Sequence, residues 1–160
     1  FDFVVEKATE VGVASIRPLL TERGVVRTER KLARWQRLAQ VATKQCGRSR
    51  VPQIEAPQSL DGVLADLARE CDAIWLATLA EKELGLVSFS RRGAVANIGL
   101  LVGPEGGFTA AEVERVRRAG VKAFAWGDRV LRADTASVVL AALVLHRSEE
   151  MLKREGGQLG

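Results

Sequence analysis

The chain has very little histidine and cysteine, and it lacks any long apolar run. His146 is the only histidine, so a histidine-based catalytic triad is excluded unless it forms there. Cys46 and Cys71 lie 25 residues apart without neighbouring metal ligands, which argues against a disulfide framework or a zinc site and for a reducing, cytoplasmic setting. No stretch approaches the roughly 20 apolar residues of a membrane span, and no signal peptide is visible, so we expect no membrane partner.

Length and charge indicate one packed domain with a polyanionic partner. The chain has 160 residues, of which 47% are apolar, and it does not begin with Met, so we expect a fragment or processed chain that lacks an N-terminal part. Residues 17–50 contain ten Lys or Arg and two Glu, a net charge of +8, whereas the rest of the chain carries −4. This basic block is typical of a nucleic-acid surface; the alternative is a solvated helix face.

Strand and helix patterns alternate along the chain. Apolar spacing predicts helices over 1–11 (ended by Gly12), 29–46, 59–70 and 109–119, and a long one from Asp134 or Thr135 to residue 145. Strands are predicted over 13–20, 73–79, 98–102 and 121–126, while 84–97 has no clear pattern. This alternation predicts an α/β domain over residues 1–160 with a mainly parallel sheet.

Residues 98–112 form the most informative stretch. An apolar run over 98–102 predicts a buried strand, a turn with three glycines follows, and Thr109 with Glu112 predicts a capping box at a helix start. The turn lacks both common phosphate-binding patterns, and Glu105 places a carboxylate where a phosphate would lie. The turn therefore suits a cationic ligand or one that carries N–H and O–H donors. The alternative is that its glycines only permit a sharp turn.

Six motifs, in this order, resemble the RsmE-type 16S rRNA (uracil N3) methyltransferases of the SPOUT superfamily. They are KATEVG at 7–12, TER at 21–23, RWQR at 34–37, QCGRS at 45–49, LVGPEGGFT at 101–109 and GDRVLRADTA at 127–136. The resemblance covers essentially the whole chain. Asp134 stands where the family usually has Glu, and Ala133 where it often has Thr, so the reach of the carboxylate at 134 is uncertain.

The resemblance implies features that residue patterns alone do not predict. It implies a C-terminal trefoil knot, a homodimer, and S-adenosylmethionine (SAM) bound by the loops after 73–79, at 103–108 and at 127–135. It also implies an N-terminal RNA-binding β-barrel domain, which we expect to be the part that is missing here. The cofactor-binding residues implied are Leu76, Thr78, Val102, Gly103, Pro104, Glu105, Gly106, Gly107, Trp126, Gly127, Val130, Leu131, Thr135 and Ala136. Leu76, Leu101, Val130 and Leu131 would flank the adenine; the alternative for each is ordinary core.

Arg132 is the candidate catalytic residue, because a guanidinium beside the uracil ring would stabilise the oxyanion that develops on its carbonyl. The alternative is that Arg132 pairs with Asp128 or Asp134 to brace its loop. The substrate implied is 16S rRNA or the small ribosomal subunit, and the candidates for contacts with its backbone are Arg23, Arg27, Arg30, Arg34, Arg48 and Arg50. The competing functions are a non-catalytic RNA-binding module, a methyltransferase acting on another RNA, and a nucleotide-binding enzyme.

Overall fold

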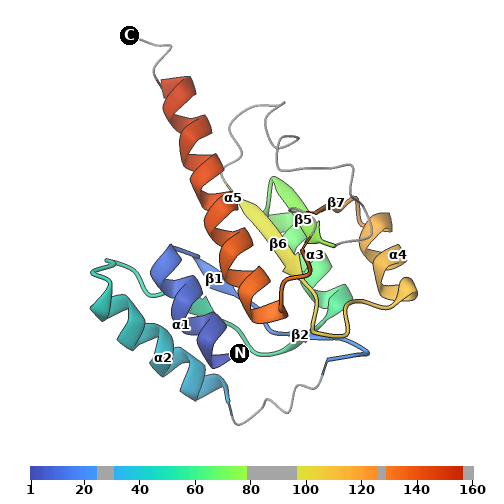
Figure 1. Ribbon diagram of the computed structural model, residues 1–160, viewed down its shortest axis with the longest axis horizontal. Helices are drawn as coiled ribbons and strands as arrows, with labels where there is room; N and C mark the ends of the chain where they lie inside the picture. Colours follow the sequence, from blue (N-terminus) through green and yellow to red (C-terminus); the bar gives the residue numbers. More distant parts are fainter. Residues whose placement is uncertain (25–30, 79–96, 126–128, 157–160) are drawn as a thin grey trace.

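The computed structural model describes residues 1–24, 31–78, 97–125 and 129–156 (Figure 1). Helices and strands alternate as the sequence predicts. The helices are α1 (Asp2–Val11), α2 (Leu32–Gln45), α3 (Leu60–Glu70), α4 (Ala110–Arg118) and α5 (Ala133–Gly156). The strands are β1 (Ser15–Ile16), β2 (Leu19–Leu20), β3 (Gln53–Ile54), β4 (Gln58–Ser59), β5 (Ala73–Ala77), β6 (Ile98–Val102) and β7 (Lys122–Phe124).

Two predicted elements differ from the structure, and two short strands were not predicted. The strand expected over 13–20 is split into β1 and β2, because Pro18 lies between them and has no N–H to donate to a ladder. The helix expected to end at residue 145 continues to Gly156, and one pair that supports the added turns is Arg147 Nη1 to Glu150 Oε2 at 2.8 Å. The short strands β3 and β4 were missed, because they pair with β1 and β2 and carry no pattern of their own.

Every strand pair in the described part of the chain is parallel, as predicted. β5 lies at the centre of a three-stranded sheet in the order β6-β5-β7. The remaining strands form two separate pairs, β1 with β3 and β2 with β4.

Helices cover both faces of the three-stranded sheet (Figure 1). On one face, Leu76 and Leu101 pack with Leu64 of α3 and Val116 of α4. On the other face, Trp75 and neighbouring apolar side chains pack with α5. Because successive strand residues point to opposite faces, the continuous apolar runs of β5 and β6 supply both cores.

A third core joins α1, α2, β1 and β3. Trp35 of α2 is 2% exposed and packs among Val5, Ile16 and Ile54, and its indole N–H donates to Asp2 Oδ1 at 2.9 Å. The apolar stripe predicted for α2 is thus buried against α1, which leaves most of its basic residues on the solvent side.

Candidate functional site

The carboxyl ends of the three sheet strands lie together at one edge. Ala77 of β5 pairs with Val102 of β6 on one side and with Phe124 of β7 on the other. The Thr78 N–H then donates to the Phe124 carbonyl at 3.0 Å. The segments that follow these strands therefore leave from the same edge, which is where ligands bind in open α/β sheets.

The glycine turn at 103–108 leaves β6 at this edge and leads into α4. The Gly107 N–H donates to the Pro104 carbonyl at 2.8 Å, and Gly107 has a φ of 66°, a left-handed conformation that favours glycine. A Cβ at Gly103 would lie 3.1 Å from the ring of Phe108, and one at Gly106 would lie 3.2 Å from Arg23 Cβ. Close contacts with neighbouring protein atoms thus explain Gly103 and Gly106, whereas the sharp-turn alternative explains Gly107. A Cβ at Gly107 would point into open space.

The capping box predicted from Thr109 and Glu112 is confirmed. The Thr109 hydroxyl accepts from the Glu112 N–H at 3.2 Å, and Glu112 Oε2 accepts from the Thr109 N–H at 2.8 Å. These two bonds fix the direction in which the chain leaves the glycine turn.

Glu112 makes one further contact, which no sequence motif indicates. Its other oxygen, Oε1, accepts from the backbone N–H of Glu22 at 2.9 Å, across 90 residues of sequence. Nearby, Arg23 Nη1 donates to the Gly106 carbonyl at 2.8 Å. The TER segment at 21–23 thus lies directly against the glycine turn.

The environment of Glu112 favours its charged form. Its side chain is 1% exposed, and burial by itself raises the pKa of a carboxyl group. The hydrogen bonds from the Thr109 and Glu22 backbone outweigh burial and hold the pKa of Glu112 below its ordinary value. Glu112 is therefore a buried carboxylate whose two oxygens both accept backbone N–H groups.

The residues predicted to bind the cofactor do not all lie together. Leu76 is 1% exposed and lies in the core, which agrees with the alternative that it is an ordinary core residue. Val130 is 79% exposed. Ala136 at the start of α5 packs in the same cluster as Ala77, so this helix begins close to the edge. Residues at the edge or in the glycine turn are Thr78, Val102, Gly103, Pro104, Glu105, Gly106 and Gly107, with Leu131 and Thr135 at the start of α5. Trp126 and Gly127 lie outside the described residues.

The candidate catalytic Arg132 is exposed immediately before α5. Its Nε lies 4.0 Å from Asp134 Oδ1, at the outer limit of an ion pair. The same Asp134 oxygen accepts from the Thr135 N–H at 2.7 Å, so the carboxylate is held by its own helix start. The Arg132 side chain is 81% exposed and accessible to a ligand.

The basic block is divided between structural and exposed arginines. Arg48 donates to the carbonyls of Thr9, Val13 and Gly12 at 2.6, 3.1 and 3.3 Å, so it caps the carboxyl end of α1. These hydrogen bonds engage the guanidinium group that we predicted would contact the RNA backbone. Arg34 is exposed and paired with Asp2, and Arg50 is exposed. Arg27 and Arg30 lie outside the described residues.

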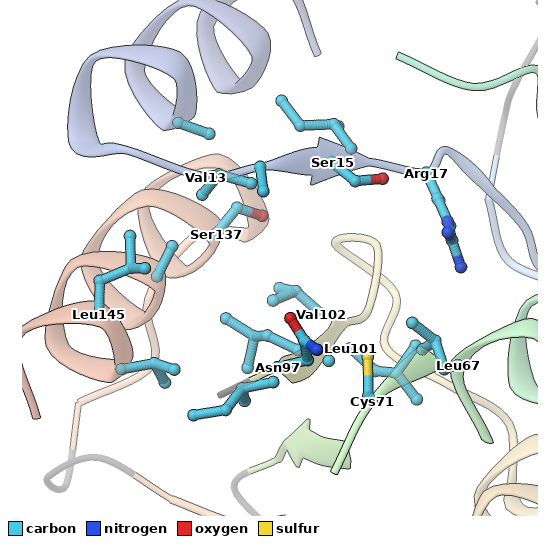
Figure 2. A pocket seen from close by; sticks show the side chains of 18 of the residues that line it. Val13, Ser15, Arg17, Leu67, Cys71, Asn97, Leu101, Val102, Ser137 and Leu145 are labelled. Atoms are coloured by element: carbon cyan, nitrogen blue, oxygen red, sulfur yellow. The ribbon is translucent and has the colours of Figure 1, made fainter. Parts of the chain in front are cut away.

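A cavity of about 500 Å³ lies along β6, and no residue of the glycine turn lines it (Figure 2). It runs between the β1 segment, with Val13, Ser15 and Arg17, and the β6 segment, with Leu101 and Val102, and α5 lines it as well. Arg17 pairs there with Glu55 and Glu70. Of the residues predicted to contact the cofactor, only Leu101 and Val102 line the cavity, and its lining is mostly apolar, so we place the candidate site at the strand ends instead.

These features define an α/β domain of the kind that binds a small ligand at the carboxyl edge of a parallel sheet. Within the described residues, no cluster of side chains suits a metal ion, and no helix is both long and apolar enough to cross a membrane.

Comparison with known proteins identifies the family. The model of the RNA methyltransferase domain matches residues 1–145. The chain therefore belongs to the RNA methyltransferase domain family, which confirms the resemblance drawn from the six motifs.

The chain is similar to several curated proteins named ribosomal RNA small subunit methyltransferase E. It is 32% identical to the one from Synechocystis over 146 residues, 90% of this chain and 48% of the relative. It is 27% identical to the one from Bacillus subtilis over 157 residues, 92% of this chain and 61% of the relative. The chain thus spans about half to three fifths of the length of these relatives.

Solved structures share the fold. The ribosomal RNA small subunit methyltransferase E from Neisseria gonorrhoeae, solved with bound SAM, has a TM-score of 0.78 and 31% identity, over 88% of this chain and 58% of that one. A protein from Legionella pneumophila described as a methyltransferase, also solved with bound SAM, has a TM-score of 0.79 and 30% identity, over 90% of this chain and 59% of that one.

Proposed function

We propose that this chain is the SAM-binding domain of an RNA methyltransferase that methylates N3 of a uridine in 16S rRNA. The observation that carries the proposal is the position of the glycine turn, the central family motif, at the carboxyl edge of the sheet beside the start of α5. Relatives named for small-subunit rRNA methylation, and similar structures solved with SAM, support it.

The residues at this edge fit SAM. The Glu105 carboxylate is exposed in the glycine turn, and SAM carries a positive sulfonium and an amino group that a carboxylate attracts. The backbone at Gly107 faces open space, so a ligand can approach it closely. Glu105, Gly106 and Gly107 would hold the polar part of the cofactor, and bound SAM supplies the methyl group.

The side chains around the edge have distinct parts in this proposal. Arg132, exposed before α5, would stabilise the negative charge that a uracil carbonyl gains when N3 loses its proton to water. N3 would then take the methyl group from the sulfonium of SAM, which leaves as S-adenosylhomocysteine. Arg23 and Arg50 are exposed and would contact the RNA backbone, which positions the substrate without reading its sequence. Arg48 makes internal hydrogen bonds and contributes less to this surface.

The proposal also includes a trefoil knot, a homodimer and a cytoplasmic location, which the family resemblance implies. The packing of the α5 start against the strand ends supports the knot, since the knotted C-terminal segment would lie there. Sedimentation equilibrium on the purified chain tests the homodimer by its mass.

Isothermal titration calorimetry of the chain with SAM and with S-adenosylhomocysteine tests the cofactor assignment. We expect micromolar binding of both, with no competition from ATP or NAD. A folded chain that binds neither, yet still binds RNA, would instead be a non-catalytic RNA-binding module. Displacement of SAM by ATP or NAD would favour a nucleotide-binding enzyme.

A further inference from the structure

Two long-range hydrogen bonds join the TER segment to the glycine turn and to α4, the helix that follows the turn. Arg23 Nη1 donates to the carbonyl of Gly106 at 2.8 Å, and the Glu22 N–H donates to Glu112 Oε1 at 2.9 Å. If the proposed function is correct, the TER segment belongs to the RNA side of the site and the glycine turn belongs to the cofactor side. The two sides are therefore in direct contact.

Glu112 is the residue on which this junction depends. Its side chain is 1% exposed, and its second oxygen, Oε2, accepts from the Thr109 N–H at 2.8 Å, where the glycine turn ends. A single buried carboxylate thus binds both the segment at 21–23 and the start of α4. A carboxamide of the same size has only one acceptor oxygen, so it can serve only one of these two N–H groups.

A second, exposed contact reinforces the junction. Arg115 Nη2 lies 3.6 Å from Glu22 Oε1, and Arg115 Nη1 lies 3.2 Å from Asp61 Oδ2. Pairs at such exposed positions contribute little by themselves. The buried carboxylate is therefore the part of the junction that substitution should change most.

We propose that Glu112 is a positioning residue that couples RNA binding to cofactor binding. It holds Arg23 over the Gly106 carbonyl, so a ligand that orders the glycine turn also orders the arginine that faces RNA. Coupling of this kind is reciprocal, so each ligand strengthens the binding of the other by the same factor. This inference rests on the proposed function, because it takes the turn as the cofactor side and Arg23 as part of the RNA side.

The test compares Glu112→Gln with Glu114→Gln. Both substitutions remove one negative charge from α4, but Glu114 is exposed and pairs with Arg118 on the same helix. Filter binding measures the affinity for 16S rRNA transcribed in vitro, with and without S-adenosylhomocysteine, at one salt concentration. We expect the wild type and Glu114→Gln to bind RNA at least about fivefold more tightly with the cofactor product. In Glu112→Gln this ratio should fall below about twofold, while its S-adenosylhomocysteine affinity without RNA stays within about threefold of wild type.

Arg23→Met is the second variant, because it removes the contact with Gly106 and leaves the buried Glu112 network in place. It should lower the coupling ratio as Glu112→Gln does, and combining the two substitutions should lower the ratio no further. This variant keeps the inference testable if Glu112→Gln does not fold.

The outcomes separate this inference from the proposed function. A wild-type chain that binds both ligands independently, or a Glu112→Gln variant with undiminished coupling, would overturn the inference and leave the proposed function standing. A folded wild-type chain that binds no S-adenosylhomocysteine would overturn both.

Discussion

Gly107 and Gly47 offer a matched test of the cofactor turn, because the same substitution at each should cost the same stability. Gly107 has a φ of 66° and Gly47 a φ of 73°, and a Cβ at either position meets nothing within 4 Å. Substitution to alanine therefore introduces left-handed strain of about 1–2 kcal/mol at each site without a steric clash. For a domain of this size, the melting temperature should fall by roughly 2–4 °C per kcal/mol.

Only Gly107 lies in the glycine turn, whereas Gly47 is exposed in the segment that follows α2. Because the added methyl group at Gly107 would occupy the open space where we place the cofactor, Gly107→Ala should weaken SAM binding at least about tenfold, equivalent to about 1.4 kcal/mol. Gly47→Ala should change SAM affinity less than about twofold, a difference below roughly 0.5 kcal/mol.

Differential scanning fluorimetry measures the stability of both variants, and calorimetry measures their SAM affinity. Equal losses of melting temperature with a selective loss of SAM binding in Gly107→Ala would support the assignment. Unchanged SAM affinity in a folded Gly107→Ala variant would refute the reasoning that places the cofactor against this turn.

Three further predictions concern the surrounding residues. Thr109→Ala should lower the free energy of unfolding by about 1 kcal/mol through loss of the cap, and a urea midpoint equal to wild type would contradict this. The pKa of Glu112 is lowered in the fold, so its stabilising contribution is present above the ordinary glutamate value of about 4.3 and is lost as the pH falls through the lower folded value. Glu112→Gln should therefore reduce the fall in the free energy of unfolding as the pH is lowered into the acid range. An unchanged pH dependence would count against a charged Glu112. Arg48→Met should lower the free energy of unfolding by about 1–3 kcal/mol and change RNA affinity little. Arg50→Met should weaken RNA binding and reduce its salt dependence, with little loss of stability. The reverse pattern in urea unfolding and filter binding would reassign the two arginines.

The sequence was most informative where neighbouring residues determine the structure. The run over 98–102 is apolar throughout because both faces of β6 are buried, and Thr109 and Glu112 form their cap within one helical turn. The αL glycine at 12 ends α1 for a similarly local reason. Such features need no knowledge of distant contacts, so a single sequence is enough to predict them.

Long-range contacts explain what the sequence left unpredicted. β3 and β4 have two residues each, and pairing with β1 and β2 defines them. Arg48 in the basic block resembled an RNA contact, but its hydrogen bonds with the end of α1 engage it internally. The bond from Glu22 to Glu112 spans 90 residues, and nothing in either local motif indicates it.

Methyl transfer itself tests the central claim most directly. The chain is incubated with SAM carrying a labelled methyl group and with unmethylated 16S rRNA or small ribosomal subunits, and the RNA is digested to nucleosides for mass spectrometry. The proposed function predicts labelled 3-methyluridine, which Arg132→Ala reduces at saturating RNA. Label in another nucleoside, or no label transferred by a folded chain that binds both SAM and RNA, would contradict it.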